Sequence, residues 1–254
     1  MKTLTGKTAL VTGASRGIGR AIARRLAQEG ALTAVHYGTN EQAAHHTLEL
    51  ISQEGGQAFA VRAELGVPGD IETLYTQLED QLARHHKGPE IDILVNNAAI
   101  SGSARIHDIT PELFDHLFAV NTKTPLFLLQ RALKNLPDGG RIINISSAAT
   151  RIAYPESIIY SMTKGALNTL TLALAKELGP RNITVNAITP GYIETDMNKH
   201  KRNTPQAANE LAAHSTFNRT GQPTDIADIV TFLASDASRW ITGQTLDASG
   251  GTHL

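Results

Sequence analysis

The sequence predicts an α/β fold in which a doubly wound parallel sheet of seven strands carries helices on both faces. Short apolar or β-branched runs alternate with longer helical stretches along the chain, which is typical of parallel strands joined by helical crossovers. The runs are almost continuously apolar, as in residues 91–95, because strands covered on both faces bury both sets of side chains. The first run leads directly into a glycine-rich segment and a helix. Together these observations favour a Rossmann-like arrangement.

Apolar runs locate six of the seven predicted strands. These six occupy residues 8–12, 32–37, 58–62, 91–95, 141–145 and 183–188. A stretch with helical periodicity follows each run, as expected because parallel strands need a crossover connection of some length. The predicted helices cover residues 18–29, 41–54, 70–86, 111–136, 157–178 and 224–234. The sequence therefore predicts a regular alternation of strand and helix without an internal repeat.

Residues 1–254 are expected to form a single domain, since α/β folds of this length often consist of one unit. One segment, 191–222, is polar and is interrupted by Pro205 and Gly221. An insertion of that length in a compact domain is usually a lid or a binding loop, and a tolerated surface excursion is the alternative. We expect a lid-like segment at about 191–222.

The composition is that of an ordinary globular protein, with 41% hydrophobic and 19% charged residues. A formal net charge of -1 without a basic stripe argues against nucleic acid as a partner. The absence of cysteine excludes disulfides and thiol catalysis and is compatible with a reducing compartment. No apolar run is long enough to span a bilayer, and the first seven residues lack the apolar core of a signal peptide. We therefore expect a cytoplasmic protein with no membrane partner.

The segment after the first strand contains Gly13, Gly17 and Gly19 and opens a helix. In such a unit the first glycine permits a sharp turn, the second lets the backbone approach a pyrophosphate, and the third allows close packing of helix on strand. The helix N-terminus presents amide donors to the anion. The spacing is Gly-x3-Gly-x-Gly, and a tight connection without a ligand is the alternative. The pattern predicts a dinucleotide site, with Ser15 and Ile18 also in contact.

The end of the second predicted strand indicates which dinucleotide is bound. Tyr37 and Gly38 are followed by Thr39 and Asn40, so the carboxylate that usually selects NAD is missing. Arg16 can instead pair with a 2′-phosphate through its planar guanidinium, while residues 39 and 40 supply neutral donors. We therefore predict NADP(H), with the alternative that Arg16 only caps a helix or points to solvent.

Tyr160 and Lys164 stand four residues apart in a predicted helix that Ser157 can cap, so their side chains lie on one face. A phenol ionises near pH 10, and lowering its pKa by about three units requires about 4 kcal/mol. An ammonium group about 4 Å away supplies about 1 kcal/mol in bulk water but about 4 kcal/mol in a partly closed site. We therefore predict that the lysine lowers the tyrosine pKa, provided that water is largely excluded.

Ser147 lies just past the end of the fifth predicted strand, at the edge where ligands bind in open α/β sheets. Its hydroxyl can hold a substrate oxygen, and the adjacent Ser146 competes for that role. Farther along the chain, Tyr154, Tyr192 and Met197 are expected to line the substrate pocket.

Asn121 lies in a predicted helix four residues before Pro125, which has no N–H to donate. The backbone carbonyl of Asn121 therefore loses its helical donor and the helix should kink. The free acceptor can hold an ordered water for proton relay. A structural kink with no chemistry is the alternative.

As a set, these residues closely resemble the short-chain dehydrogenase/reductase family in its compact single-domain form, and the match covers almost the whole chain. Its motifs are T-G-A-S-R-G-I-G at 12–19, N-N-A-A at 96–99, P-G at 190–191, and the four residues Asn121, Ser147, Tyr160 and Lys164. The resemblance implies that Tyr160 is the general acid of carbonyl reduction and that Lys164 holds the nicotinamide ribose. It also implies that Ser147 orients the carbonyl and that Asn121 holds the relay water.

The same resemblance implies the path of the cofactor, with residues 96–98 passing along it and with Ile193 and Thr195 at the carboxamide. Glu64, after the third strand, can contact an adenine amino group. The complete set of expected cofactor contacts is Gly13, Ser15, Arg16, Gly17, Ile18, Gly19, Tyr37, Gly38, Thr39, Asn40, Glu64, Leu65, Asn96, Asn97, Ala98, Tyr160, Lys164, Pro190, Gly191, Ile193 and Thr195. No metal site is expected, because the adjacent histidine pairs point in different directions on their helices.

Residues 139–161 and 225–251 look most like the 3-oxoacyl-[acyl-carrier-protein] reductases of this family. An acyl carrier protein is then a possible partner, because Arg181 stands where such reductases carry arginine. Docking an acidic helix needs a basic patch, however, and Pro137 and Asp138 occupy positions where more positive charge is expected. The resemblance implies NADPH-dependent reduction of a small-molecule ketone. The alternatives are an NAD-dependent alcohol dehydrogenase of the same family and a non-catalytic NADPH-sensing regulator.

The predicted helix 157–178 is apolar on more than one face in its second half. The sheet can cover one face, and a helix of this kind needs cover on both sides. We therefore expect a homo-oligomer, either a dimer or a tetramer.

Overall fold

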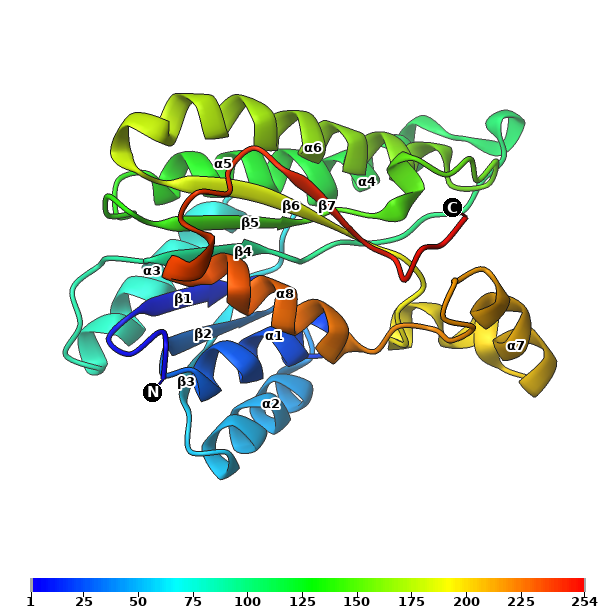
Figure 1. Ribbon diagram of the computed structural model, residues 1–254. Coiled ribbons are helices and arrows are strands. Elements are labelled where there is room, and N and C mark those ends of the chain that lie inside the picture. Colours follow the sequence, from blue (N-terminus) through cyan, green and yellow to red (C-terminus); the bar gives the residue numbers. More distant parts are fainter. Residues whose placement is uncertain (1, 254) are drawn as a thin grey trace.

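The centre of the computed structural model, which describes residues 2–253, is a seven-stranded sheet with the order β3-β2-β1-β4-β5-β6-β7 (Figure 1). Every pair of neighbouring strands is parallel. The strands are β1 Thr8–Val11, β2 Leu32–Tyr37, β3 Gln57–Arg62, β4 Ile93–Asn96, β5 Arg141–Ile145, β6 Thr184–Pro190 and β7 Thr245–Ala248. The predicted fold class is confirmed.

The seventh strand, β7, is the one that no apolar run located. Its residues alternate between exposed and partly buried, because it lies at the edge of the sheet beside β6. An edge strand that is half exposed lacks the continuous apolar signal of the inner strands. The five inner strands of the sheet, β2, β1, β4, β5 and β6, are buried along their whole length.

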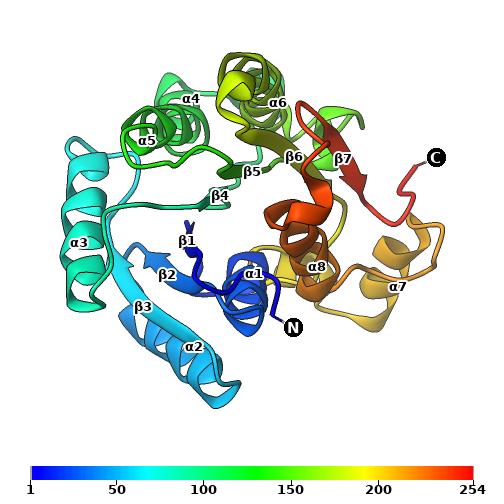
Figure 2. The ribbon, with the colours of Figure 1, turned by 60° about the vertical axis from the view of Figure 1, so that its left-hand side comes forward.

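Helices cover both faces of the sheet. They are α1 Gly17–Gln28, α2 Glu41–Gln53, α3 Asp70–Arg84, α4 Pro111–Phe118, α5 Thr124–Ala132, α6 Ile158–Leu178, α7 Pro205–Ala213 and α8 Pro223–Ala234. Figure 2 shows α1, α2 and α8 on one side and α3, α5 and α6 on the other. Each side has its own apolar cluster against the strands. Within residues 2–253, no helix has the length and apolar character needed to cross a bilayer.

The predicted helix 111–136 is interrupted. After α4 the chain makes a π-helical turn over Ala119–Lys123, and α5 then begins at Thr124. The amide of Thr124 donates to the carbonyl of Ala119, five residues earlier. Because Pro125 supplies no amide, the hydrogen-bond ladder widens at this point. The disturbance expected at the proline is present, in the form of a π turn.

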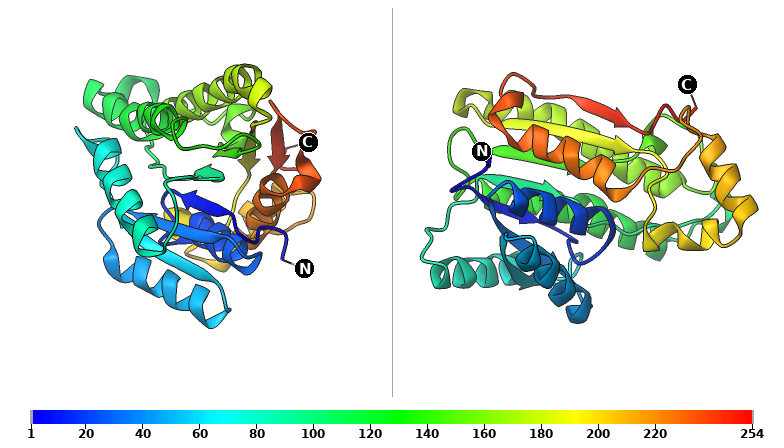
Figure 3. Two further views of the ribbon diagram at one scale, coloured as in Figure 1. Left: turned by 90° about the vertical axis from the view of Figure 1, so that its left-hand side faces the viewer. Right: turned by 60° about the horizontal axis from the view of Figure 1, so that its bottom comes forward.

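The segment 191–222 contains helical structure that its polar sequence did not suggest. Asp196–Arg202 form a 3-10 helix and Pro205–Ala213 form α7, which begins where the Thr204 hydroxyl accepts from the amide of Ala207. None of the α7 residues is buried, so hydrophobic periodicity gives no signal for it. The pair Thr204 and Pro205 is a typical helix start and could have located it. Figure 3 shows α7 beyond the carboxyl ends of the strands.

Candidate active site

The carboxyl ends of the parallel strands gather the predicted site residues at one edge of the sheet. The glycine loop follows β1, Tyr37 ends β2, Glu64 follows β3, and the N-N-A-A motif ends β4. Ser147 follows β5, and the P-G motif ends β6. Ligands in open α/β folds bind at this edge, where the direction of chain crossover changes.

The glycine loop has no side chains at three positions, so its backbone is not covered there. Gly13 has a φ of +63°, and a Cβ atom there would lie 2.9 Å from the Cα of Ala98. A Cβ atom on Gly19 would overlap the carbonyl oxygen of Gly13. Only glycine fits either position without moving the neighbouring loop. The loop therefore forms the kind of cradle that a pyrophosphate requires.

Hydrogen bonds join this loop to the motif after β4. The hydroxyl oxygen of Thr12 accepts from the amides of Asn97 and Ala98 at 2.9 and 3.0 Å. The side-chain amide of Asn97 donates to the carbonyls of Thr12 and Gly13 at 2.8 and 3.1 Å. Sequence reasoning counted Asn97 as a cofactor contact but missed Thr12. The two loops consequently form one rigid unit.

The groups expected to select the cofactor lie at the rim of this unit. Arg16 occupies the N-cap position of α1, but its side chain makes no capping bond. That side chain is exposed and makes no ion pair with any residue in 2–253, as in the alternative that it points to solvent. Asn40 accepts from the amide of Ala43 at 2.9 Å and thereby caps α2, which leaves its NH₂ group to donate elsewhere. Tyr37 is buried, whereas Gly38 and Glu64 are more open.

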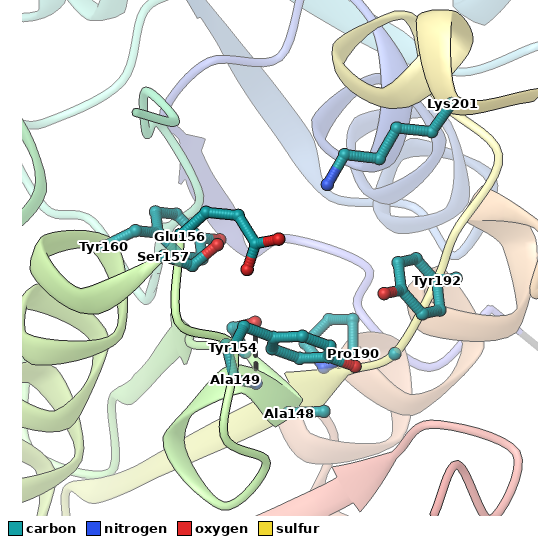
Figure 4. Close-up of a pocket in the computed structure, with 11 residues that line it drawn as sticks. Ala148, Ala149, Tyr154, Glu156, Ser157, Tyr160, Pro190, Tyr192 and Lys201 are labelled. Carbon is teal, nitrogen blue, oxygen red and sulfur yellow. Dashed lines mark hydrogen bonds between the residues drawn. The ribbon is translucent and has the colours of Figure 1, made fainter. Parts of the chain in front are cut away.

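A pocket of about 250 Å³ lies on the catalytic side of the edge (Figure 4). Both Ser147 and Tyr160 line it. The oxygen of the Ser147 hydroxyl accepts from the amide of Ala149 at 3.1 Å, so its proton can be donated to the Tyr160 oxygen or to a ligand. Ser146 is buried and donates to the carbonyl of Lys164 at 3.2 Å. The structure therefore brings Ser147 into the pocket and leaves its competitor outside.

Lys164 is 3% exposed and is not among the residues that line this pocket. Its ammonium nitrogen donates to the carbonyl of Ile145 at 2.8 Å and lies 5.8 Å from the centre of the Tyr160 ring. Burial lowers the pKa of Lys164 to about 8. At pH 7 the side chain is therefore still mostly charged, although it is held in an environment that disfavours the charge.

The pKa of Tyr160 shifts in the direction opposite to the one expected. Burial raises it, and the hydrogen bond with Ser147 lowers it only in part. The spacing of four residues brings the lysine near the tyrosine ring, but it does not report how far burial penalises a phenolate. The shift keeps the phenol protonated at neutral pH. That is the form required of a proton donor.

Asn121 lies inside the π turn and is 1% exposed. Its side chain accepts from the amide of Ile100 at 2.9 Å, and it donates to the carbonyl of Ile100 at 2.9 Å and to the hydroxyl of Thr163 at 3.2 Å. Thr163 in turn donates to the carbonyl of Tyr160 at 2.7 Å. Asn121 thus ties the loop after β4 to the first turns of α6. The prediction that the backbone carbonyl of Asn121 holds a relay water stays a prediction.

Two expectations about the surroundings of the site are wrong. Ser157 occupies the position before α6, but its side chain makes no capping bond; it lines the pocket instead. Met197 does not line the pocket and is 45% exposed. Tyr154 and Tyr192 do line it, with ring centres 6.3 Å apart in an edge-to-face arrangement. The pocket wall is therefore aromatic on one side.

Sequence reasoning missed two charged residues at the mouth of the pocket. Glu156 precedes α6 and Lys201 belongs to the 3-10 helix at 196–202, and Figure 4 shows both side chains directed toward the opening. They are not within ion-pair distance of each other. Exposed charges in a turn carry no periodicity, so only the folded arrangement of the segment 191–222 reveals them.

The residues after β6 differ in what they offer a cofactor. A Cβ atom on Gly17 would lie 3.2 Å from the Thr195 methyl group, so Thr195 lies directly against the glycine loop. The Ile193 side chain is 6% exposed and belongs to the apolar cluster that α1 and α8 share, so its backbone is what can face a ligand. Within residues 2–253, no group of three or more side chains could hold a metal ion.

The chain is similar to reductases along almost its whole length. Residues 13–253 match the family model described as Enoyl-(Acyl carrier protein) reductase. The structure resembles that of the promiscuous reductase LugOII, which catalyses keto-reduction at C1 during lugdunomycin biosynthesis, with 55% identity, a TM-score of 0.95 and 98% of each chain covered. It also resembles the angucycline C-6 ketoreductase LanV with bound NADP, at 50% identity and a TM-score of 0.94, over 98% of this chain and 96% of the other. Among curated sequences, the versicolorin reductase of Emericella nidulans is 40% identical over 98% of this chain and 96% of its own.

Proposed function

Because the chain belongs to the short-chain dehydrogenase/reductase family, we propose that it is an NADPH-dependent reductase whose substrate is a ketone on a polycyclic aromatic compound. The observation that carries the proposal is the presence of the Ser147 and Tyr160 hydroxyls in one pocket, with the buried Lys164 ammonium 5.8 Å from the Tyr160 ring. The coarser activity, reduction of a carbonyl group with NADP(H), is supported by the keto-reduction of LugOII and by the ketoreductase LanV with bound NADP.

The aromatic character of the substrate is supported by the pocket and by the relatives together. Tyr154, Tyr192 and Pro190 give the pocket flat apolar walls, against which fused rings can stack. The relatives described above are an angucycline ketoreductase, a reductase of lugdunomycin biosynthesis and a versicolorin reductase. A planar substrate of this kind would place one ring carbonyl at Ser147 and Tyr160.

The glycine loop, the motif after β4 and the rim residues fit a dinucleotide. The bare backbone at Gly13 and Gly19 accommodates a pyrophosphate, and the unpaired guanidinium of Arg16 suits a 2′-phosphate. Thr195, next to Gly17, would lie toward the nicotinamide end. When NADPH is bound there, its nicotinamide supplies the hydride.

The side chains of the pocket position the carbonyl oxygen of the substrate and supply its proton. Ser147 would donate a hydrogen bond to the substrate carbonyl and Tyr160, kept protonated by its raised pKa, would deliver the proton to the oxygen. The charged Lys164 would stabilise negative charge that develops on the substrate and on the phenol oxygen. The same side chains could serve the reverse reaction, so the alternative of an NAD-dependent alcohol dehydrogenase is separated by comparing the affinities for NADH and NADPH in wild type and in Arg16→Ala.

A 3-oxoacyl thioester carried by an acyl carrier protein receives less support. Arg181 pairs with Asp138 at 2.8 Å, which neutralises the charge that an acidic helix would need. Arg181 also precedes β6, so it lies at the amino edge of the sheet, opposite the pocket. We keep this substrate as an arm of the test.

The test is NADPH consumption with a panel of polycyclic aromatic ketones, 3-oxoacyl thioesters and simple cyclic ketones, each with wild type and Tyr160→Phe. We expect the highest kcat/KM on the polycyclic ketones and its loss in the variant. A preference for thioesters would contradict the proposed substrate class. Absence of turnover on every ketone, together with tight NADPH binding, would favour a cofactor-sensing regulator.

We also propose that the protein is a homo-oligomer. The α6 helix has a buried face against the sheet, whereas Leu172 on the same helix is 59% exposed and Met162 is 49% exposed. A second copy covering this face would bury both side chains. Sedimentation at micromolar concentration should give a dimer or tetramer, and a monomer would contradict this. A cytoplasmic location stays a prediction of the sequence.

A further inference from the structure

His36 is a buried side chain in β2 that the proposed reaction does not use. It is 2% exposed, and both of its ring nitrogens are hydrogen-bonded. Nδ1 lies 3.0 Å from the amide nitrogen of Gly13, and Nε2 lies 3.0 Å from the carbonyl oxygen of Ala63. Because a backbone amide can only donate and a carbonyl can only accept, the neutral ring must carry its proton on Nε2. One tautomer alone satisfies both partners.

These partners belong to two different loops of the cofactor site. Gly13 is the first glycine of the loop after β1, and Ala63 directly precedes Glu64 and Leu65 after β3. The backbone of β2 strengthens the connection, since the His36 carbonyl accepts from the amide of Ala14 at 2.8 Å. The ring therefore links the loops after β1 and β3, and it lies immediately before Tyr37, where the loop after β2 begins.

The glycine loop is held at both ends. At its outer end, the carbonyl of Ser15 accepts from the Arg20 guanidinium at 2.6 Å and from the Thr47 hydroxyl at 3.2 Å. At its inner end, Asn97 donates to the Gly13 carbonyl at 3.1 Å, and only the Gly13 amide is left to the His36 ring. A buried amide that loses its partner carries a desolvation penalty, and a residue with a positive φ has other turns open to it. Without the ring, the inner end of the loop has a reason to rearrange.

We infer that His36 is a positioning residue for the adenosine-phosphate half of NADP(H), acting chiefly through the Gly13 amide and not by touching the cofactor. The ring holds the Gly13 amide turned into the protein, and the His36 carbonyl holds the Ala14 amide, so that the amides from Ser15 onward are left to face the phosphates. It also sets the position of the backbone from which Glu64 and Leu65 project. The inference rests on the proposed NADP(H) binding.

A purely space-filling role makes a different prediction, because an apolar ring of similar size would then serve equally well. Two polar substitutions separate the contacts. In asparagine the side-chain oxygen stands as many bonds from Cα as Nδ1 does in histidine, so His36→Asn can still accept from Gly13. In glutamine the amide nitrogen corresponds to Nε2, so His36→Gln can still donate to Ala63.

The experiment measures dissociation constants without any ketone. NADPH is titrated by its fluorescence, and 2′,5′-ADP, which contains only the adenosine-phosphate half, is titrated by calorimetry. We expect His36→Asn to bind both probes within about threefold of wild type, and His36→Gln and His36→Phe to bind them about tenfold more weakly or worse. At saturating NADPH, kcat should stay within about twofold in all three variants. His45→Asn, on the exposed face of α2, is the matched control and should change nothing.

Equal affinity of all folded variants for 2′,5′-ADP would overturn the inference and assign His36 to packing alone. Recovery of affinity by His36→Gln but not by His36→Asn would also overturn it, because the Gly13 contact would then be dispensable. If His36→Phe does not fold, as judged by thermal unfolding, the comparison of the two amides decides. Since no substrate is present, a failure of the proposed ketone reduction would leave these binding results valid.

Discussion

The two halves of the carboxyl edge hold their buried titratable groups in opposite ways. On the side of β1 to β3, both nitrogens of His36 are hydrogen-bonded, and burial lowers its pKa to about 4, so the ring is neutral at physiological pH. On the side of β5 and β6, Lys164 makes one hydrogen bond, to the carbonyl of Ile145, and burial lowers its pKa only to about 8. One side buries a neutral group that is fully satisfied. The other buries a charge.

This difference has a consequence for stability. Between pH 4 and 6.5 the unfolded chain binds more protons at His36 than the folded chain does, so the free energy of unfolding rises with pH across that window. Above pH 6.5 the ring is neutral in both states and no longer lowers the free energy of unfolding. For Lys164 the corresponding window runs from about 8 to 10.5. Below pH 8 the protein therefore carries the full penalty of a buried ammonium, about 3 kcal/mol. The cofactor half is built for stability, whereas the catalytic half gives up stability to keep a charge.

The largest effect should come from Tyr160→Phe, which tests whether the catalytic half acts by proton transfer. We expect kcat to fall by about 10³-fold, because the proton donor is removed, while the Kd for NADPH stays unchanged. The measurement is NADPH oxidation with a polycyclic ketone at saturating cofactor. Tyr154→Phe, in the same pocket, is the control and should lose no more than a few-fold. Near wild-type turnover of Tyr160→Phe would refute the proposed mechanism.

Lys164→Met tests whether the buried charge is held at the expense of stability. Activity should fall by about 10²-fold, because a preorganised charge at the site is lost. The free energy of unfolding at pH 7 should increase by up to about 3 kcal/mol, because a buried ammonium is replaced by an apolar side chain. Denaturant unfolding gives the second quantity, with Lys176→Met on the exposed face of α6 as the control. A less stable Lys164→Met would mean that the ammonium is a net stabilising group, and the comparison would fail.

Arg16→Ala sharpens the comparison from the cofactor side, where the charge is exposed. Its removal should therefore have little effect on the free energy of unfolding. The Kd for NADPH should rise about tenfold or more, because charge-assisted hydrogen bonds to the 2′-phosphate are lost. The Kd for NADH should not change, and neither should the unfolding midpoint. Equal loss of both cofactors would assign Arg16 to the pyrophosphate and contradict its role in selectivity.

The pH dependence should distinguish the two halves within the wild-type protein. Lys164 is charged below its pKa of about 8, so the rate of reduction should be nearly constant from pH 6.5 to 7.5 and should fall by about fivefold between pH 8 and 9. Affinity for 2′,5′-ADP, which contains only the adenosine-phosphate half, should stay level over the same range because His36 does not titrate there. A rate that rises through pH 8 would show that the neutral amine is the active form.

The smallest effect is expected from Tyr192→Leu, which alters the pocket wall without touching the proton path. Loss of an aromatic contact should raise KM for a polycyclic ketone several-fold while kcat changes little. The same variant should leave KM for a small cyclic ketone unchanged. Equal effects on both substrates would argue against stacking at this wall.

Steric requirements fix the glycines of the cofactor half, so the shape of that loop could be predicted from the sequence, whereas its contacts with the cofactor stay predictions. Gly13 and Gly19 stand where a Cβ atom would meet the backbone of a neighbouring loop, and such restrictions appear directly in the spacing of the residues. Ser147, Tyr160 and Lys164 could likewise be placed by strand ends and helical spacing. The pKa of Tyr160 could not, because spacing reveals a neighbour but not the degree of burial around it.

The substrate half is harder to predict, since its shape depends on exposed segments. α7 buries none of its residues, and Lys201 reaches the pocket only because the 3-10 helix at 196–202 folds back over it. The prediction of Met197 as a lining residue was wrong for the same reason. Exposed helices follow capping signals and not hydrophobic periodicity, so amphipathic patterns do not locate them.

The π turn at Ala119–Lys123 makes this part of the chain sensitive to its length as well as to its composition. A π turn amounts to one residue inserted into an α-helix, so α5 is offset from α4 by about 100° of rotation. Removing a single residue there would rotate the Asn121 side chain away from Thr163, while Pro125 would still lack an amide to donate. Substitutions keep the length of this turn, whereas a deletion would uncouple the loop after β4 from α6.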